Sequence, residues 1–161
     1  MKYELFLDLD GVCADFESKV KEITGFYPHE IPTGKMWKAC ATHPEFFATL
    51  DWMHDGQELW NFCKDHNPTI LTGMPHGKWA SGQKKRWVGE KMGWDVPVIT
   101  CMSSDKPEEA MKVRKHPNSV LVLIDDREDA GIRWKRTNGV FIHHTSTSNS
   151  IHMFNSFLGT I

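Results

Sequence analysis

The sequence lacks the features that would indicate a zinc site, a disulfide framework or a membrane segment. Its four cysteines are scattered and form no Cys-x-x-Cys pair, so free thiols in a reducing cytoplasm are expected. The nine histidines show no His-x-x-His or Glu-x-x-His spacing. No apolar run reaches membrane-spanning length, and the N-terminus has no basic-then-apolar signal. A cytoplasmic protein without a membrane partner is therefore expected.

The chain also lacks a strong net charge. With 19 Lys and Arg against 21 Asp and Glu, its formal net charge is −2, which gives no general attraction to anionic partners. We therefore expect no long nucleic acid as a partner. Any binding of phosphate must come from a local group of residues. A homodimer is one assembly that the sequence allows.

The chain has the size and composition of one soluble domain spanning residues 1–161, with 40% hydrophobic and 25% charged residues. Short apolar runs predict five strands, and the longer segments between them have helical spacing. The predicted strands are residues 4–8, 69–72, 96–101, 120–125 and 140–143, and the predicted helices are residues 14–24, 56–64, 79–92, 107–115, 129–137 and 150–158. Strands that alternate with helices predict an α/β fold, a Rossmann-like parallel sheet with helices on both faces.

One segment interrupts the alternation of strands and helices. Residues 26–55 contain several prolines and aromatic residues but no convincing strand, and the segment is too long for an ordinary connection. We predict a small helical cap inserted at about residues 17–55.

The first predicted strand runs directly into Asp8, Asp10 and Gly11. Side chains alternate along a strand, so the two carboxylates lean to the same side and repel each other unless a cation shares their charge. Mg²⁺ would do so, and it also binds phosphate oxygens. Gly11 permits a sharp turn beside a ligand. The alternative is a plain acidic turn after a strand.

Polar residues also follow the later strands. Thr72 and Gly73 end the second strand and suit a phosphate oxygen, Lys106 follows the third, and Asp125 and Asp126 end the fourth. Each has a plain alternative: a turn, a solvated lysine and a helix cap. Together they lie at the carboxyl edge of one predicted sheet, where ligands bind in such folds.

This combination resembles the haloacid dehalogenase superfamily of phosphotransferases, whose pattern is a DxD strand end, a Thr or Ser strand end, a lysine and a late acidic pair. The opening DLDGVCADFE at residues 8–17 is similar to DMDGVLADFE of the 5'(3')-deoxyribonucleotidases. LIDDR at residues 123–127 matches their LIDDR, and the segment at residues 85–88 is similar to their K-x-x-W-V helix. The resemblance covers nearly the whole chain.

The chain departs from this family at two motifs. The family's Thr-Ser-Pro is Thr-Gly-Met-Pro at residues 72–75, so one hydroxyl that could touch phosphate is missing. Its Arg-Asp-Lys is Ser-Asp-Lys at residues 104–106, so one positive charge is missing. The stretch between Lys106 and Asp125 is longer than expected, which leaves Lys115 as an alternative for the lysine role.

The resemblance implies a mechanism for the acidic residues. Asp8 would be the nucleophile that forms an aspartyl-phosphate, and Asp10 would be the general acid and base. Mg²⁺ would be held by Asp8, the backbone carbonyl of Asp10 and Asp126. Asp125 would hold Lys106, although Asp125 and Asp126 could exchange these roles.

The resemblance also implies the substrate contacts. Thr72, Gly73 and Lys106 would hold the phosphate together with Asp10, with Thr72 and Lys106 counted among the catalytic residues. Phe16 matches a position that contacts the base of a nucleotide, and the alternative is a core residue on the first helix. Cap aromatic residues could stack on a base or form a small cap core, and Lys78 and Lys84 could reach phosphate or lie in solvent: these are Trp37, Phe46, Phe47, Trp52, Lys78 and Lys84.

The sequence therefore predicts a Mg²⁺-dependent phosphomonoesterase of the 5'-nucleotidase type that hydrolyses (deoxy)nucleoside monophosphates. One alternative within enzymes is the same chemistry on a polynucleotide 3'-phosphate or a small metabolite phosphate. An alternative of another class is a non-catalytic phosphoryl-accepting or Mg²⁺-binding module. Asp10 discriminates between them, because turnover needs a general acid and base and a slow phospho-switch does not.

Overall fold

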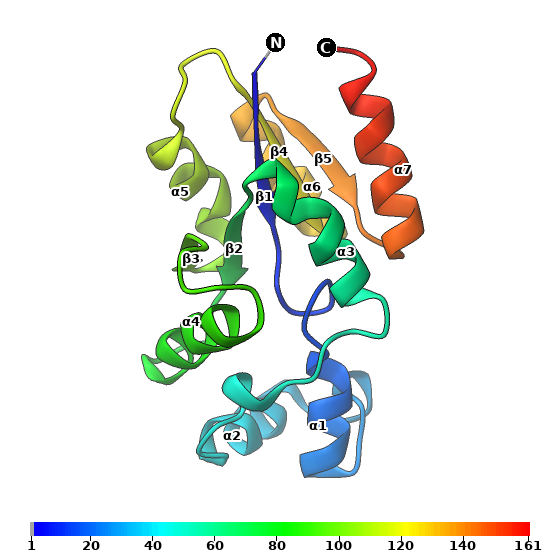
Figure 1. Ribbon diagram of the computed structural model, residues 1–161. Coiled ribbons are helices and arrows are strands. Elements are labelled where there is room, and N and C mark those ends of the chain that lie inside the picture. Colours follow the sequence, from blue (N-terminus) through cyan, green and yellow to red (C-terminus); the bar gives the residue numbers. More distant parts are fainter. Residues whose placement is uncertain (1) are drawn as a thin grey trace.

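The apolar runs of the sequence form one parallel sheet in the computed structural model, which describes residues 2–161 (Figure 1). The strand order is β3-β2-β1-β4-β5. The strands are β1 (Tyr3–Leu7), β2 (Thr69–Gly73), β3 (Val98–Cys101), β4 (Val120–Asp125) and β5 (Val140–His143). The predicted α/β fold with a parallel sheet is confirmed. β3 begins two residues later than predicted, because Pro97 has no N–H and contributes only its carbonyl, which accepts from the Ile70 N–H.

The central strands bring the carboxyl ends of the sheet together. β1 pairs with β4 in register from Tyr3 opposite Val120 to Leu7 opposite Ile124, and the Asp8 N–H continues the ladder to the Ile124 carbonyl at 3.0 Å. On its other side β1 pairs with β2, and β2 pairs with β3. The residues that follow β1, β2, β3 and β4 therefore share one edge.

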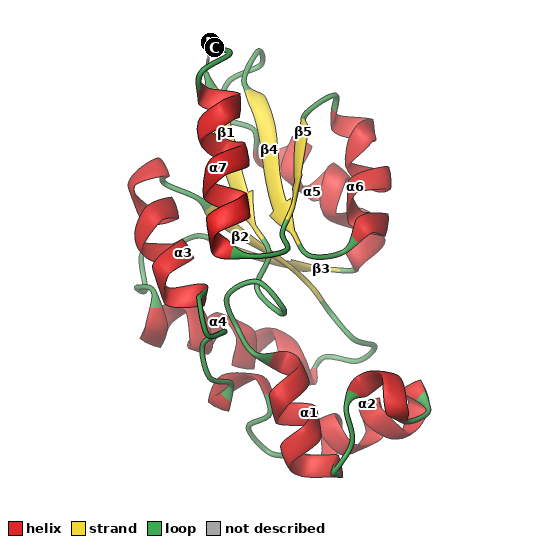
Figure 2. Ribbon diagram, turned by 90° about the vertical axis from the view of Figure 1, so that its right-hand side faces the viewer, coloured by secondary structure: helices red, strands yellow, loops and turns green. Residues whose placement is uncertain are grey.

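Helices cover both faces of the sheet, and each face has its own core (Figure 2). Leu5 and Leu7 of β1 face the larger core with Phe154 of α7, whereas Phe6 faces the smaller core with Trp134 of α6. The larger core also takes in α3 (Gly56–Cys63), α4 (Trp79–Lys91) and α7 (Thr147–Leu158), and the smaller one takes in α5 (Lys106–Val113) and α6 (Glu128–Trp134).

The start of α7 and the end of α6 differ from the expected boundaries for local reasons. α7 begins at Thr147 instead of residue 150, because Ser146 accepts a hydrogen bond from the Asn149 N–H as the N-cap. α6 stops at Trp134, and residues 135–137 continue as a 3-10 turn that ends at Asn138 in the left-handed region. No helix within residues 2–161 combines the length and apolar content that crossing a membrane requires.

The segment that interrupts the alternation is helical and lies beyond the carboxyl edge of the sheet, where Figure 1 shows α1 (Phe16–Thr24) and α2 (Thr33–Thr42). α1 begins two residues later than expected, because residues 10–14 form a tight loop and Asp15 caps the helix by accepting from the Ser18 N–H. Further 3-10 turns occur at Pro28–Glu30, Phe47–Thr49, Lys64–His66 and Ser103–Asp105. A separate cap at residues 17–55 stays a prediction.

Packing against α4 fixes this segment relative to the sheet. The Phe47 N–H donates to Gln83 Oε1 at 2.8 Å, and the Trp87 indole N–H donates to the Leu50 carbonyl at 2.8 Å. Phe46 and Phe47 are both buried, and Trp52 packs edge-on against Trp87 with ring centroids 4.9 Å apart. Most of these aromatic residues therefore form a core between the segment and α4.

Candidate active site

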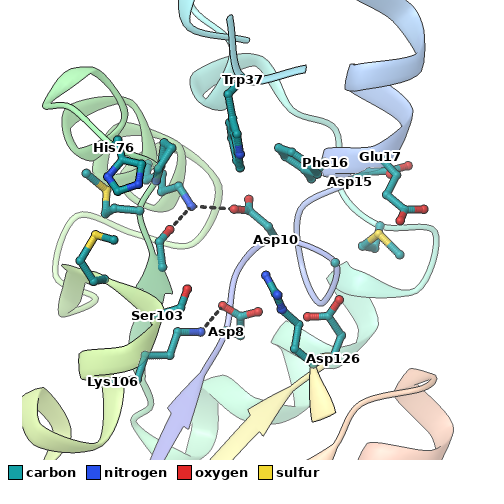
Figure 3. A pocket seen from close by; sticks show the side chains of 18 residues that line it. Asp8, Asp10, Asp15, Phe16, Glu17, Trp37, His76, Ser103, Lys106 and Asp126 are labelled. Atoms are coloured by element: carbon teal, nitrogen blue, oxygen red, sulfur yellow. Dashed lines mark hydrogen bonds and ion pairs between the residues drawn. The ribbon is translucent and has the colours of Figure 1, made fainter. Parts of the chain in front are cut away.

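The predicted site residues meet at the carboxyl edge of the sheet, around a cavity of about 630 Å³ (Figure 3). Its wall includes Asp8, Asp10, Gly73, Lys106 and Asp126. They come from the ends of β1 and β2, the start of α5 and the residue after β4. The volume lies in the range of ordinary ligand pockets.

Lys106 joins two of the predicted acids. Its Nζ donates to Asp8 Oδ1 at 2.9 Å and to Asp125 Oδ2 at 2.8 Å, and all three side chains are less than a tenth exposed. Burial alone would lower the pKa of Lys106, but the two carboxylates outweigh it and raise the pKa. Lys106 is therefore a cation in direct contact with the Asp8 carboxylate.

Lys115 lies elsewhere. Its backbone N–H donates to the carboxylate of Glu4, near the amino end of β1, at 3.0 Å. The Ser119 hydroxyl donates to the same carboxylate, so Glu4 holds the loop that follows α5 in place. The additional residues between Lys106 and Asp125 are taken up in this loop, at the edge opposite the cavity, and the structure brings Lys106 to the site instead of Lys115.

Asp8, Asp125 and Asp126 each offer a carboxylate oxygen within 4.8 Å of the others. Burial, together with repulsion from Asp8 and Asp125, raises the pKa of Asp126 to about 8. Asp126 Oδ1 is buried and has no hydrogen-bond partner among residues 2–161. Clustered carboxylates with excess negative charge, one of them with an unpartnered oxygen, fit a hard divalent cation such as Mg²⁺.

The two adjacent acids at the end of β4 differ in their partners. Asp125 accepts from Lys106 through Oδ2 and from the Arg127 N–H through Oδ1 at 3.0 Å, so both of its oxygens are engaged. Asp126 lines the cavity and has a free oxygen. This favours Asp126 as the metal ligand and Asp125 as the residue that holds Lys106.

The loop after β1 places Asp10 above Asp8. The amides of Cys13 and Ala14 both donate to the Leu9 carbonyl, at 2.8 and 2.9 Å, which closes a tight turn. Gly11 has a φ of 77° in this turn, and a Cβ built on it would overlap the Asp126 carboxylate. Glycine is therefore required for the close approach of the loop to Asp126.

Lys84 of α4 forms an ion pair with Asp10. Its Nζ donates to Asp10 Oδ2 at 2.6 Å, to Thr72 Oγ1 at 2.9 Å and to the Gly73 carbonyl at 2.7 Å. Burial, partly offset by the Lys84 ammonium, raises the pKa of Asp10. Asp10 is a quarter exposed, and its Oδ1 has no partner among the described residues. One oxygen of Asp10 is thus fixed and the other is free.

Sequence reasoning gave Lys84 too little weight. It is only 1% exposed, whereas Lys78, the other lysine considered beyond β2, is exposed. The signal lies in the motif itself, since Lys84 stands three residues before Trp87 and is therefore the lysine of the K-x-x-W-V pattern. Lys84 also lies over the ring of Phe47, at 4.3 Å from its centroid.

At the end of β2, Gly73 lines the cavity, whereas the predicted phosphate contact Thr72 is not part of the lining. Thr72 is fully buried, and its hydroxyl accepts from Lys84 and keeps its own proton to donate. The amides of Ile70 and Met74 donate to carbonyls of the β3 segment. Successive N–H groups alternate in direction along a strand, so the Gly73 N–H points away from β3.

Aromatic side chains form the wall of the cavity that lies across Asp10 from Asp8. Figure 3 shows Phe16 and Trp37 there. The Phe16 ring packs against Trp37, Phe46 and Phe47, with the first two centroid distances both 5.6 Å. Phe16 therefore belongs to the aromatic core and also borders the cavity, and its contact with a base stays a prediction.

Comparisons with known proteins agree with this architecture. No protein-family model and no curated protein matches the sequence. Among solved structures, a hydrolase from Streptococcus pneumoniae TIGR4 superposes with a TM-score of 0.60 at 14% identity, over 96% of this chain and 100% of that one.

Two further solved structures, both described as haloacid dehalogenase-like or HAD-superfamily hydrolases, also resemble the chain. A haloacid dehalogenase-like family protein from Streptococcus pneumoniae gives a TM-score of 0.57 at 9% identity, covering 87% of this chain and 83% of that one. A HAD-superfamily hydrolase from Ehrlichia chaffeensis gives 0.50 at 12% identity, covering 94% and 97%. The fold is haloacid dehalogenase-like. At these identities the likeness concerns the fold alone, so the function must be argued from the site.

Proposed function

We propose that this protein is a Mg²⁺-dependent phosphomonoesterase that hydrolyses (deoxy)nucleoside monophosphates through an aspartyl-phosphate on Asp8. The observation that carries the proposal is the arrangement around Asp8. Its carboxylate is held by a buried lysine at 2.9 Å, and Asp126 and Asp10 border the same cavity. The haloacid dehalogenase-like fold supports the same chemistry.

In the first step an oxygen of Asp8 attacks phosphorus, and the bond between phosphorus and the ester oxygen breaks. Asp10 gives its proton to the departing oxygen, which leaves as an alcohol. Burial raises the pKa of Asp10, which favours its protonated form, and Lys84 holds the other Asp10 oxygen in place. Lys106 offsets the negative charge that gathers on the phosphoryl group.

In the second step Asp10, now a carboxylate, takes a proton from water. The hydroxide oxygen bonds to phosphorus, the bond from phosphorus to Asp8 breaks, and inorganic phosphate leaves. Lys106 receives the Asp8 carboxylate again, so the starting arrangement is restored. The same carboxyl group thus acts as acid and then as base, and its free Oδ1 suits both roles.

Asp8, the backbone carbonyl of Asp10 and Asp126 would hold Mg²⁺, which would offset the repulsion between the Asp8 carboxylate and a phosphate dianion. Asp125 takes no part in this set, because Lys106 and the Arg127 amide occupy its oxygens.

The cavity supports a nucleoside monophosphate over smaller phosphate esters. Its volume of about 630 Å³ exceeds what a phosphate group needs, and Phe16 and Trp37 offer flat apolar surfaces at a distance from Asp8 (Figure 3). Aromatic rings stack readily on the face of a base. The unpartnered Asp10 oxygen in turn favours a turnover enzyme over a phosphoryl-accepting module.

The proposal is tested by a screen of phosphate release. Purified protein is incubated with nucleoside monophosphates, a 3'-phosphorylated oligonucleotide and sugar phosphates, each with Mg²⁺ and with a chelator, and Asp8→Asn serves as the control. We expect Mg²⁺-dependent release from nucleoside monophosphates and none from Asp8→Asn. Equal release by that variant would refute the covalent mechanism, and preferential release from either of the other substrate classes would replace the proposed substrate.

A further inference from the structure

The strand end of β2 lacks a side chain where the resembling nucleotidases carry a serine, because residue 73 is glycine. We propose that Ser103, which follows the neighbouring strand β3, supplies the missing hydroxyl and donates a hydrogen bond to the phosphoryl group of the substrate. This inference rests on the proposed phosphomonoesterase function. It adds a substrate contact that none of the motifs contains.

The sheet brings Ser103 to Gly73. β2 and β3 are adjacent and parallel, with Gly73 in register with Cys101, and the Met74 N–H donates to the Cys101 carbonyl at 2.9 Å. Ser103 comes two residues after Cys101 and begins a 3-10 turn. The two strand ends leave the sheet side by side, so a side chain at residue 103 can reach over residue 73.

The hydroxyl occupies the space that a side chain at residue 73 would fill. A Cβ built on Gly73 would overlap Ser103 Oγ, and it would lie 3.3 Å from Ser103 Cβ and 3.6 Å from its Cα. The glycine and the serine are therefore sterically coupled. The Ser103 hydroxyl stands where the first side-chain atom of residue 73 would be.

The Ser103 hydroxyl is free to bind a ligand. Ser103 is half-buried and lines the cavity with Gly73 and Lys106, and Figure 3 shows it beside Lys106 on the side that faces Asp8. Its Oγ makes no hydrogen bond to another of the described residues, unlike Thr72 Oγ1, which is bound by Lys84. An unpartnered hydroxyl in a polar cavity is a ready donor to an anionic oxygen.

Ser103 and Lys106 reach the cavity from one short turn. Lys106 begins α5 three residues after Ser103, so the same stretch of backbone carries a hydroxyl and an ammonium group to the nucleophile. Ser104 lies between them and is exposed outside the cavity lining, which makes it a matched control.

The test compares Ser103→Ala with Ser104→Ala. Loss of a hydrogen bond to a charged group is expected to weaken binding of inorganic phosphate, measured by calorimetry with Mg²⁺, by about tenfold. We expect a similar rise in KM for the nucleoside monophosphate substrate. Ser104→Ala should leave both values unchanged, and the thermal midpoints of both variants should match that of the parent protein.

The decisive variant moves the hydroxyl to the other strand. In Gly73→Ser combined with Ser103→Ala the overlapping oxygen is gone, and the new Cβ faces a carbon at 3.3 Å, which a small shift accommodates. We expect phosphate affinity within about threefold of the parent, following the same hydrogen-bond estimate. Gly73→Ser alone should bind phosphate worse, because its side chain overlaps Ser103.

The outcomes separate this inference from the proposed function. If no phosphate ester is hydrolysed by the parent protein, the proposed function fails, and phosphate binding still tests Ser103. Unchanged phosphate affinity in Ser103→Ala, absence of any phosphate binding by the parent protein, or a folded double variant no better than Ser103→Ala would each overturn the role of Ser103.

Discussion

The contact between Lys84 and Asp10 allows a sharp test of how the proposed general acid is controlled. Lys84→Met keeps the unbranched apolar stem of the side chain, is one atom shorter and removes the charge. Three acceptors lose their partner: Asp10 Oδ2, Thr72 Oγ1 and the Gly73 carbonyl. Because Lys84 is only 1% exposed, water cannot readily replace its ammonium group behind Asp10.

The stability cost follows from burial. Breaking a fully buried ion pair by removing one partner costs about 3–5 kcal/mol. Asp10 is a quarter exposed, so solvent recovers part of the loss and we expect about 2–3 kcal/mol. For a chain of this size that lowers the thermal midpoint by about 5–10 °C. The protein should remain folded at room temperature.

The effect on catalysis is a change in pH dependence. The Lys84 ammonium lowers the pKa of Asp10, against the larger effect of burial. Removing the ammonium takes away the interaction that lowers this pKa, so the pKa rises further. Since kcat/KM reports the first step, in which Asp10 must carry its proton, its alkaline limb should move to higher pH.

The assay is a pH profile of kcat/KM for Lys84→Met, with the exposed Lys85→Met as control. Lys85→Met should leave the profile and the thermal midpoint unchanged. If the alkaline limb of Lys84→Met stays in place although the protein is less stable, Lys84 has only a structural role. If neither property changes, the ion pair read from the structure is wrong.

Two further predictions concern Lys106 and Asp126. Lys106→Ala should lower kcat by at least about 100-fold, because it removes the cation beside the nucleophile, whereas Lys115→Ala should match the parent in steady-state assays; the reverse result would exchange their roles. The folded pKa of Asp126 is raised from 3.8 to about 8, so its charged form opposes folding and metal-free protein should lose stability as the pH rises between these values. Thermal melts in chelator should show a midpoint several degrees lower at pH 8 than at pH 5, and Mg²⁺ or Asp126→Asn should reduce this difference; an unaltered pH dependence in Asp126→Asn would contradict the assignment.

Much of the candidate site follows from the sequence because parallel strands end at one edge. Asp8, Thr72, Lys106 and Asp126 each come directly after an apolar run or begin the following helix, so their convergence needs only the sheet. The choice between Lys106 and Lys115 needs more, since it depends on where the additional residues after α5 fold. In the structure these residues form a loop that is hydrogen-bonded to Glu4 at the opposite edge of the sheet.

The positions of Lys84 and Ser103 in the site could not be predicted from the sequence, for different physical reasons. A lysine in a helix with little amphipathic pattern is ordinarily solvated, and Lys84 is buried only because Phe47 and its neighbours pack over α4. The proposed role of Ser103 depends on how close the ends of β2 and β3 lie to each other. The spacing of residues along the chain does not give that distance. The absent hydroxyl at residue 73 is visible in the sequence, but the hydroxyl that fills its place is not.

Under the proposed function, the distribution of charge gives a reason for a divalent cation at this edge. Four carboxylates meet there, and two lysines form ion pairs with three of them. Lys106 binds Asp8 and Asp125, and Lys84 binds Asp10. Asp126 contacts neither lysine, and its pKa is raised more strongly than that of the adjacent Asp125. A phosphate dianion entering this cavity would add further negative charge beside Asp8. In the proposed mechanism the two lysines therefore orient the nucleophile and the general acid separately, and the carboxylate of Asp126 is the negative charge that a metal ion would balance as phosphate approaches.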